Sequence, residues 1–192
     1  MKVIAFNGSA RKDGNTAKLI RYTFEELENE GIETELLQLA GSRIQGCIAC
    51  YKCFANKDCR CVVNNDIANE CLEKMHNADG IIIGSPTYFA GITPEAKALI
   101  DRCGMVARAN GDILKRKVGA GVVAARRGGA IHVFDTINHF FTISQMIVVG
   151  SSYWNIGVGR NIGDVDADEE GLKTMRDLGV NMAWLLKKLD GQ

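Results

Sequence analysis

Short apolar runs alternate along this chain with segments whose apolar residues recur every three or four positions. Residues Val3–Phe6 form a near-continuous apolar run, which is typical of a parallel strand buried on both faces. The next segment has a helical period instead, with apolar residues at Ala17, Ile20, Phe24 and Leu27. The start of the chain is therefore predicted to form a strand, a loop and an amphipathic helix.

The same alternation continues to the end of the chain, without an internal repeat or a linker. Five strands are predicted, over residues 3–6, 33–39, 80–84, 118–125 and 146–149. Five helices are predicted between and after them, over residues 15–29, 66–77, 94–106, 129–143 and 169–189. Trp184, on the last helix, is expected in the core.

Strands that alternate with helices form a parallel sheet, because right-handed crossovers place the helices on both of its faces. We therefore expect an α/β fold, a flavodoxin-like three-layer sandwich with a five-stranded parallel sheet in the order 2-1-3-4-5. Residues 1–192 are expected to form a single domain with a cysteine-rich loop at 41–65. Ligands of such sheets bind beyond the carboxyl ends of strands 1 and 3, where the strand order reverses.

The loop after strand 1 is rich in small and polar residues and leads directly into a helix. The free N–H groups and the dipole of a helix N-terminus favour an anion, most simply a phosphate. A Walker A loop is excluded because five residues separate Gly8 from Gly14 and Asn15 replaces the lysine. A dinucleotide fingerprint is excluded because position 10 is Ala. The remaining alternative is an ordinary turn between a strand and a helix.

The motif of this loop, G-S-x-R-x-x-G-N-T, resembles the phosphate loop of the flavodoxin-like NAD(P)H-dependent FMN reductases. The resemblance implies that the loop binds the phosphate of FMN, and its hydroxyl, amide and guanidinium groups suit a terminal phosphate. The residues expected to contribute are Ser9, Arg11, Gly14, Asn15 and Thr16.

Two later loops also resemble parts of that family. The segment S-P-T-Y-x-x-x-x-x-P after strand 3 resembles its isoalloxazine loop, which implies flavin contacts from Pro86, Thr87, Tyr88, Phe89 and Gly91. The loop after strand 4 closes over the ring in that family, which implies contacts from Ala125, Arg126, Gly128 and Gly129. The alternative is that the aromatic side chains pack on the neighbouring helix and the arginines are simply solvated.

The chain has seven cysteines, and four of them fall within thirteen residues, so a disulfide framework is not expected. The spacing of Cys47, Cys50, Cys53 and Cys59 suits four thiolate ligands of a [4Fe–4S] cluster. This spacing matches the compact motif of the iron–sulfur flavoproteins, which are relatives of the FMN reductases. The resemblance covers most of the chain, including the tail W-N-I-G-x-G-R that begins at Trp154.

The role of the cysteine motif stays open on three points. A zinc site is one alternative, although zinc usually draws its ligands from two separated Cys-x-x-Cys pairs. Related FMN reductases often carry partial cysteine motifs without a cluster, so free or redox-active thiols are another. Cys61 follows closely and leaves open which four cysteines are the ligands.

The charge balance restricts the partners, because Lys plus Arg and Asp plus Glu number 23 each. A neutral chain without a basic run argues against nucleic acid as a partner. Since neither a signal peptide nor a membrane span is apparent, a cytoplasmic protein is expected. The cysteine loop follows an edge strand, away from the flavin loops, which predicts a homo-oligomer, and the resemblance implies a homodimer or homotetramer.

These features predict an FMN-dependent oxidoreductase that moves electrons through FMN and a [4Fe–4S] cluster, between small-molecule or protein donors and acceptors. NAD(P)H is the expected co-substrate, and Arg126 and Arg127 are candidates to bind its phosphate. No catalytic side chain is assigned, because the flavin carries the redox chemistry. The alternative is an FMN-binding electron carrier or redox sensor with free thiols and no NAD(P)H turnover.

Overall fold

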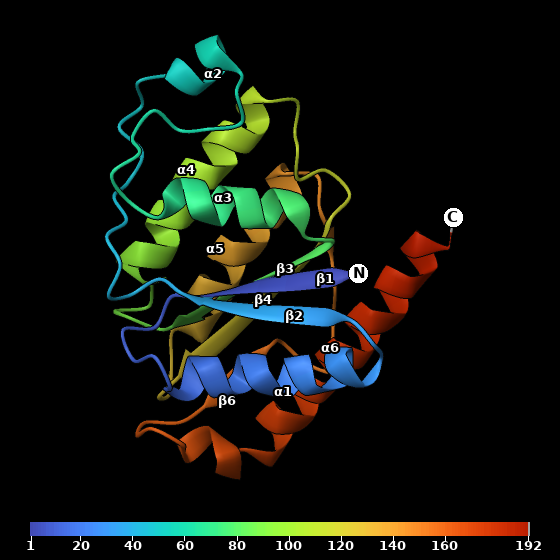
Figure 1. The fold of residues 1–192 in the computed structure, drawn as a ribbon. Helices are drawn as coiled ribbons and strands as arrows, with labels where there is room; N and C mark the ends of the chain where they lie inside the picture. The colour runs from blue at the N-terminus through green and yellow to red at the C-terminus, as the bar shows by residue number, and fades with distance from the viewer. Residues whose placement is uncertain (192) are drawn as a thin grey trace.

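The computed structural model describes residues 1–191 and places a parallel sheet between two layers of helices (Figure 1). The strands span Lys2–Asn7 (β1), Glu33–Gln38 (β2), Gly80–Pro86 (β3), Val118–Ala125 (β4), Ile147–Val148 (β5) and Ile156–Val158 (β6). The order β2-β1-β3-β4-β5 confirms the predicted topology, and β6 also pairs with β4.

Helices cover both faces of this sheet, as predicted. They span Asn15–Asn29 (α1), Lys52–Asn56 (α2), Ala68–Asn77 (α3), Pro94–Ala109 (α4), Ala130–Ile143 (α5) and Glu169–Asp190 (α6), and a 3₁₀ turn spans Asp164–Ala167 (η1). Helices α1 and α6 lie on one face, whereas α3, α4 and α5 lie on the other (Figure 1). The segment 41–65 runs over the second layer and contains α2, a helix that the sequence pattern does not predict.

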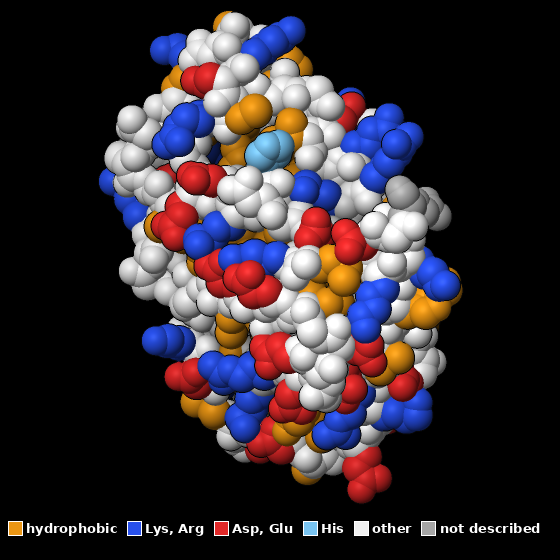
Figure 2. Space-filling view, turned by 45° about the vertical axis from the view of Figure 1, so that its right-hand side comes forward, with side chains coloured by type: hydrophobic (Ala, Val, Ile, Leu, Met, Phe, Trp, Pro, Cys, Tyr) orange, Lys and Arg blue, Asp and Glu red, His pale blue; other side chains and the backbone are white. Residues whose placement is uncertain are grey.

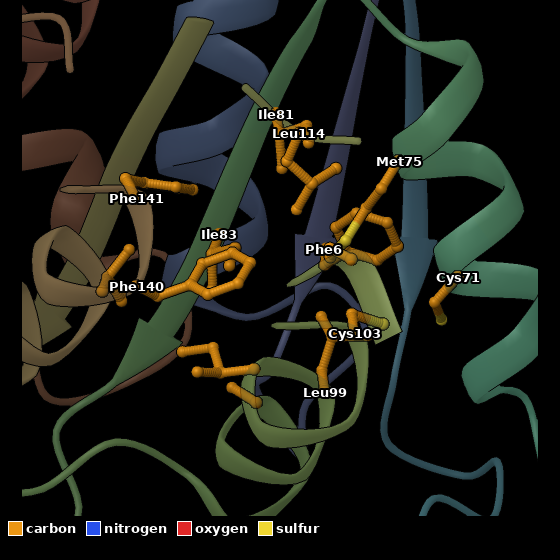
Figure 3. Packing of buried hydrophobic residues seen from close by; sticks show 14 of the residues in the cluster. Phe6, Cys71, Met75, Ile81, Ile83, Leu99, Cys103, Leu114, Phe140 and Phe141 are labelled. Carbon is orange, nitrogen blue, oxygen red and sulfur yellow. The ribbon is translucent and has the colours of Figure 1, made fainter. Parts of the chain in front are cut away.

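Side chains of the central strands enter two separate cores, because successive residues point to opposite faces of the sheet. Phe6 and Ile83 pack under α3, α4 and α5, whereas Ala5 and Ile82 pack under α1 and α6. Figure 3 shows the first of these cores, to which the helices contribute Met75, Leu99 and Phe140. Since both faces are covered, β1, β3 and β4 are buried almost throughout, which explains their continuous apolar runs.

Two glycines allow the helices to approach the strand ends closely. A Cβ at Gly84 in β3 would lie 2.6 Å from Cδ1 of Ile20 and 2.9 Å from Cγ2 of Thr16, both on α1. A Cβ at Gly8, directly after β1, would lie 2.8 Å from Oγ1 of Thr93, the residue that precedes α4. The N-termini of α1 and α4 therefore lie beside the carboxyl ends of β1 and β3.

The fifth position of the sheet is divided between two short strands, so the predicted strand over residues 146–149 accounts only for the first of them. β5 pairs with the beginning of β4 and β6 with its end. Between them, the buried Asn155 side chain donates from Nδ2 to the Gly121 carbonyl at 3.0 Å and returns the chain to the sheet. The residues after β6 are thereby brought to the carboxyl end of β4.

The prediction that Trp184 packs in the core is wrong, because its side chain is 62% exposed. Helix α6 instead buries Leu178, Met182 and Leu186, and Trp184 shares the outer face with Val180. Apolar residues occur on both faces of this helix, so the period of the sequence does not show which face packs against the sheet.

Acidic and basic side chains are interspersed over the face shown in Figure 2, in keeping with the equal numbers of each in the sequence. None of the helices within residues 1–191 combines the length and the apolar character that crossing a membrane requires.

Candidate functional site

A cleft of about 220 Å³ opens where the carboxyl ends of β1, β3, β4 and β6 meet. Its lining comes from four separate loops and consists of Ser9, Arg11, Asn15, Thr16, Pro86, Thr87, Tyr88, Ala124, Ala125, Arg126, Gly159 and Arg160. The three loops predicted to bind a flavin therefore converge on one site. Five predicted residues lie near this lining in sequence without being part of it, namely Gly14, Phe89, Gly91, Gly128 and Gly129, and their flavin contacts stay predictions.

The loop after β1 is held in shape by its own polar side chains. The backbone N–H of Ser9 donates to Oδ1 of Asn7 at 3.0 Å, and the N–H of Arg11 donates to Oγ of Ser9 at 3.1 Å. Gln38, at the end of β2, donates from Nε2 to the carbonyl of Ser9 at 2.6 Å. Gly14 occupies the position before α1 and offers no side chain to cap it. The N–H groups of the first turn therefore remain available to a ligand in the cleft.

Thr16 and Thr87 each place a buried hydroxyl in this cleft without a hydrogen-bond partner among residues 1–191. Thr16 is only 1% exposed. A buried hydroxyl left unpaired costs about 1–3 kcal/mol of folding free energy. Such a cost is typical of a site in which a ligand supplies the partner. The residues present therefore fit a ligand that carries hydrogen-bond acceptors, as the phosphate and ring of FMN do.

The positive charge of the cleft comes from Arg11, Arg126 and Arg160, all of which are exposed at its rim. No lining residue in the described part of the chain carries a carboxylate. An anionic group in the cleft therefore meets guanidinium groups and helix N–H groups without a competing negative charge.

The side chain of Asn15, which is predicted to bind the phosphate, bonds to the loop after β6. Its Nδ2 donates to the carbonyl of Asn161 at 2.8 Å, and its Oδ1 accepts from the N–H of Gly163 at 2.8 Å. Both side-chain atoms thus attach the loop after β6 to the N-terminus of α1. This loop places Arg160 in the lining of the cleft. The site prediction does not include Arg160, although it is the last residue of the motif G-x-G-R in the tail.

The loop after β3 forms a tight turn at the edge of the cleft. The N–H and carbonyl groups of Tyr88 and Gly91 bond to each other at 2.8–2.9 Å, and Phe89 and Ala90 take positive φ angles of 47° and 60°. Phe89 is fully exposed at 109%, so it does not pack on the neighbouring helix. A Cβ at Gly129, whose φ is +84°, would lie 3.0 Å from Cα of Ala90. The two predicted flavin loops therefore touch each other.

A second and smaller pocket, of about 20 Å³, lies beneath the cysteine-rich segment. Its lining includes four cysteines, Cys47, Cys50, Cys53 and Cys61, together with Arg102 and Met105 of α4. Cys53 is 8% exposed, and burial raises the pKa of its thiol. Cys59, the fourth ligand expected from spacing, is exposed and is not part of the lining, so its role stays a prediction.

The cysteine pocket is not a preformed site for a single metal ion. All seven cysteines are free thiols, and within residues 1–191 no three His, Cys, Asp or Glu side chains converge on one point. A [4Fe–4S] cube takes one thiolate at each of four separate irons, so its ligands surround a volume instead of converging. The lining thiols are of the kind that such a cluster takes, but a pocket of about 20 Å³ has room for about one water molecule, so the segment has to open before a cluster can bind there.

Beneath this pocket, Arg102 and Asp66 form an ion pair whose side chains are 1% and 0% exposed. Nη1 of Arg102 lies 2.8 Å from Oδ2 of Asp66, and Nη2 lies 3.3 Å from Oδ1. Burial opposes the charged form of Asp66, but the guanidinium and the N–H groups of Gln45 and Ala68 outweigh it and lower the pKa of this carboxyl. The Asp66 carboxyl is thus charged at neutral pH, whereas Nε of Arg102 has no acceptor within residues 1–191.

Comparison with known proteins agrees with this geometry. The family model of the NADPH-dependent FMN reductases matches residues 1–161. An iron-sulfur flavoprotein of Methanocaldococcus jannaschii is 41% identical over 194 residues, which cover 97% of this chain and 98% of that protein. An iron-sulfur flavoprotein of Methanosarcina thermophila is 33% identical over 189 residues, with coverage of 97% and 96%. The solved structure of RosB with a bound 8-demethyl-8-formylriboflavin-5'-phosphate has a TM-score of 0.79 at 22% identity, over 100% of this chain and 81% of RosB, which shows a shared fold.

Proposed function

Because the chain belongs to the NADPH-dependent FMN reductase family, we propose that it is an FMN-dependent oxidoreductase with a [4Fe–4S] cluster as its second redox group. The observation that carries this proposal is that the buried hydroxyls of Thr16 and Thr87, which have no partner in the described part of the chain, lie in a cleft rimmed by arginines. Thr16 belongs to the loop that is expected to bind the phosphate, and Thr87 belongs to the loop that is expected to bind the ring.

The phosphate is proposed to bind at the N-terminus of α1. Thr16 donates from Oγ1, the first N–H groups of the helix donate from the backbone, and Arg11 supplies a positive charge. Ser9 fixes the loop by accepting the N–H of Arg11, and its own O–H remains able to donate to the phosphate. Asn15 positions the loop that carries Arg160.

The ring is proposed to lie along the loop after β3. Thr87 donates from Oγ1, and Pro86 and Tyr88 line the same side of the cleft. The turn at residues 88–91 approaches Gly129 closely beside this part of the cleft. When bound, FMN supplies hydride acceptance and one-electron chemistry, while the protein positions the ring.

A nicotinamide nucleotide is the proposed electron donor, bound at the outer rim of the cleft. Arg126 and Arg160 are exposed there, and their guanidinium groups suit the phosphates of such a donor. Electron transfer without nicotinamide turnover, as in an electron carrier or redox sensor, is the second candidate. If no cluster is bound, the free thiols of the cysteine segment favour this second candidate.

A homodimer or homotetramer is proposed as the assembly. Ile48, Tyr51 and Phe54 are large apolar side chains exposed on the cysteine-rich segment, and Phe89 is exposed on the ring loop. Exposed apolar side chains gathered on one segment are typical of an interface. Light scattering tests this proposal, and a monomer at micromolar concentration contradicts it.

Anaerobic purification followed by analysis of FMN, iron and sulfide tests the cofactors. Steady-state oxidation of NADH and NADPH with an artificial acceptor then separates the two candidate functions. Turnover with either nucleotide supports the oxidoreductase, whereas bound FMN without turnover supports the carrier. A protein that is colourless and does not bind added FMN contradicts both.

A further inference from the structure

We propose that Gln38 and Asn7 are positioning residues for the loop at residues 8–14, and that Gln38 thereby sets how strongly the protein prefers FMN to riboflavin. The inference rests on the proposed function, because it presupposes that this loop binds the phosphate of FMN. Neither residue is among the predicted site residues, and neither lines the cleft. Their role follows from the bonds that they make to the loop.

The two residues form a pair across the carboxyl ends of two neighbouring strands. Asn7 ends β1 and Gln38 ends β2, and they are register partners in the parallel sheet. Nδ2 of Asn7 donates to Oε1 of Gln38 at 2.6 Å. Asn7 is completely buried and Gln38 is half-buried. Since each amide has both a donor and an acceptor, this bond leaves the Asn7 oxygen and the Gln38 nitrogen available for other partners.

Both of these atoms bond to the backbone of Ser9, at the start of the loop. Oδ1 of Asn7 accepts the N–H of Ser9 at 3.0 Å, and Nε2 of Gln38 donates to the carbonyl of Ser9 at 2.6 Å. Nδ2 of Asn7 also donates to the carbonyl of Lys12 at 3.3 Å. Two side-chain amides thus bond to both ends of a loop that has no regular secondary structure. Such bonds satisfy backbone groups that a helix or a sheet would otherwise satisfy.

Gln38 acts on the loop from outside the cleft. It lines a separate groove of about 500 Å³ between α1 and β2, together with Lys12 and Leu36. Ser9, whose carbonyl it holds, lines the cleft itself. A carbonyl without this bond is free to turn toward the cleft, where its partial negative charge opposes a phosphate. Gln38 therefore supports the anion site without touching the ligand, as supporting residues of preorganised sites do.

A loop that is held before the ligand arrives favours the ligand that uses the loop. Without the two amides, the loop has to be ordered when FMN binds, and the entropy lost in that step weakens the binding. Riboflavin lacks the phosphate, so its binding does not depend on the order of this loop. A variant at Gln38 is therefore expected to change the ratio of the two affinities, whereas general damage to the fold weakens both.

The test compares Gln38→Leu with its matched control Gln145→Leu in the full-length chain. Gln145 also makes a side-chain bond, from Nε2 to Oδ2 of Asp112 at 3.0 Å, but it is exposed and does not line the cleft. The Kd values of FMN and of riboflavin are measured by fluorescence titration of the flavin-free proteins. Loss of the two hydrogen bonds of Gln38 should raise the Kd for FMN about tenfold. The Kd for riboflavin in Gln38→Leu, and both Kd values in Gln145→Leu, should stay unchanged.

Gln38→Glu tests which of the two bonds matters. The carboxylate still accepts from Nδ2 of Asn7, but it has no donor for the carbonyl of Ser9. We expect FMN binding in Gln38→Glu to be weakened at least as much as in Gln38→Leu. Normal FMN binding in Gln38→Glu contradicts the importance of the bond to Ser9 and overturns the inference.

The other outcomes separate this inference from the proposed function. If the unchanged protein prefers FMN and Gln38→Leu keeps that preference, the inference fails and the phosphate site stands. Equal weakening of both flavins in Gln38→Leu, or the same loss in Gln145→Leu, shows a general structural effect and also overturns the inference. If the unchanged protein does not prefer FMN, the proposed phosphate site fails and the inference fails with it. Gln38→Met replaces the leucine variant if that variant does not fold, and the same change in the ratio is expected of it.

Discussion

The guanidinium of Arg102 and the carboxylate of Asp66 form a buried pair, 2.8 Å apart, that joins α4 to the segment before α3. Nη1 and Nη2 of Arg102 also donate to the carbonyls of Gln45 and Val63, and the carboxylate accepts the N–H groups of Gln45 and Ala68. This ion pair therefore helps to attach a long segment with little regular structure to the domain, beside the bonds of Cys59 to Asn110 and of Cys61 to Asn69.

Replacing Arg102 is expected to destabilise the fold strongly. Arg102→Met leaves the Asp66 carboxylate buried without its partner, and breaking a buried pair in this way costs about 3–5 kcal/mol. We expect urea denaturation at pH 7 to show a loss of that size in the free energy of unfolding. Lys97→Met on the same helix is the matched control, because it breaks the exposed Lys97–Asp101 pair and should cost less than about 1 kcal/mol. Equal losses in the two variants contradict the role given to Arg102.

The contribution of Asp66 is expected to depend on pH. Its pKa is lower in the folded protein than the ordinary value of 3.8, so the unfolded chain binds the proton more readily in acid. The stability that the carboxylate provides is therefore present above pH 3.8 and is lost as the pH falls through its folded pKa. We expect the difference in unfolding free energy between the unchanged protein and Asp66→Asn to shrink below about pH 4. A difference that stays constant from pH 7 to pH 3 speaks against this assignment.

Thr16→Val is expected to weaken FMN binding without harming the protein that lacks FMN. The valine keeps the shape of threonine and removes a buried hydroxyl that has no hydrogen-bond partner among residues 1–191. A hydrogen bond to a charged phosphate is worth about 1.5–3 kcal/mol, so the Kd for FMN should rise about tenfold or more. The free energy of unfolding without FMN should stay equal or increase.

Thr174→Val is the control for that experiment. Its hydroxyl is buried on α6 and donates to the carbonyl of Glu170, away from the cleft. We expect a normal Kd for FMN and a somewhat lower stability, which is the reverse of the pattern expected for Thr16→Val. If the Kd for FMN is unchanged in Thr16→Val, the Thr16 hydroxyl does not bind the phosphate.

The cysteines are expected to differ in their reactivity when no cluster is bound. Burial raises the pKa of Cys71 to about 12 and that of Cys103 well above its ordinary value, so neither forms a thiolate near neutral pH. Brief treatment with iodoacetamide at pH 8, read by peptide mass mapping, should modify the exposed cysteines 47, 50 and 59 and spare these two. Unfolding the protein first should allow all seven to react, and early modification of Cys71 in the folded protein contradicts the packing of α3.

The strands of the central sheet are predictable from sequence because burial on both faces leaves a plain apolar run, as in Gly80–Gly84. β6 is not predictable in this way, since it has only three residues and depends on the side chain of Asn155 bonding to a distant strand. Similarly, the motif after β1 indicates the cleft, but not that the side chain of Asn15 serves the loop at 161–163.

The cysteine segment shows the same limit more clearly. Spacing along the chain predicts Cys47, Cys50, Cys53 and Cys59 as ligands, but it reports only how far apart the thiols are in sequence. The position of Cys61 depends on its bonds to Asn69 and on the anchoring of Val63 by Arg102, which join residues that are far apart in the sequence.

The central claim is that the N-terminus of α1 binds the phosphate of a flavin mononucleotide. Fluorescence titration of the flavin-free protein with FMN and with riboflavin, which lacks the phosphate, tests it directly. Two charge-assisted hydrogen bonds to the phosphate, of about 1.5 kcal/mol each, correspond to a Kd for FMN that is about 100-fold lower than the Kd for riboflavin. The account predicts that FMN binds at least about that much more tightly than riboflavin, with the difference reduced in Thr16→Val. Equal affinities for the two flavins, or no binding of either, contradict it.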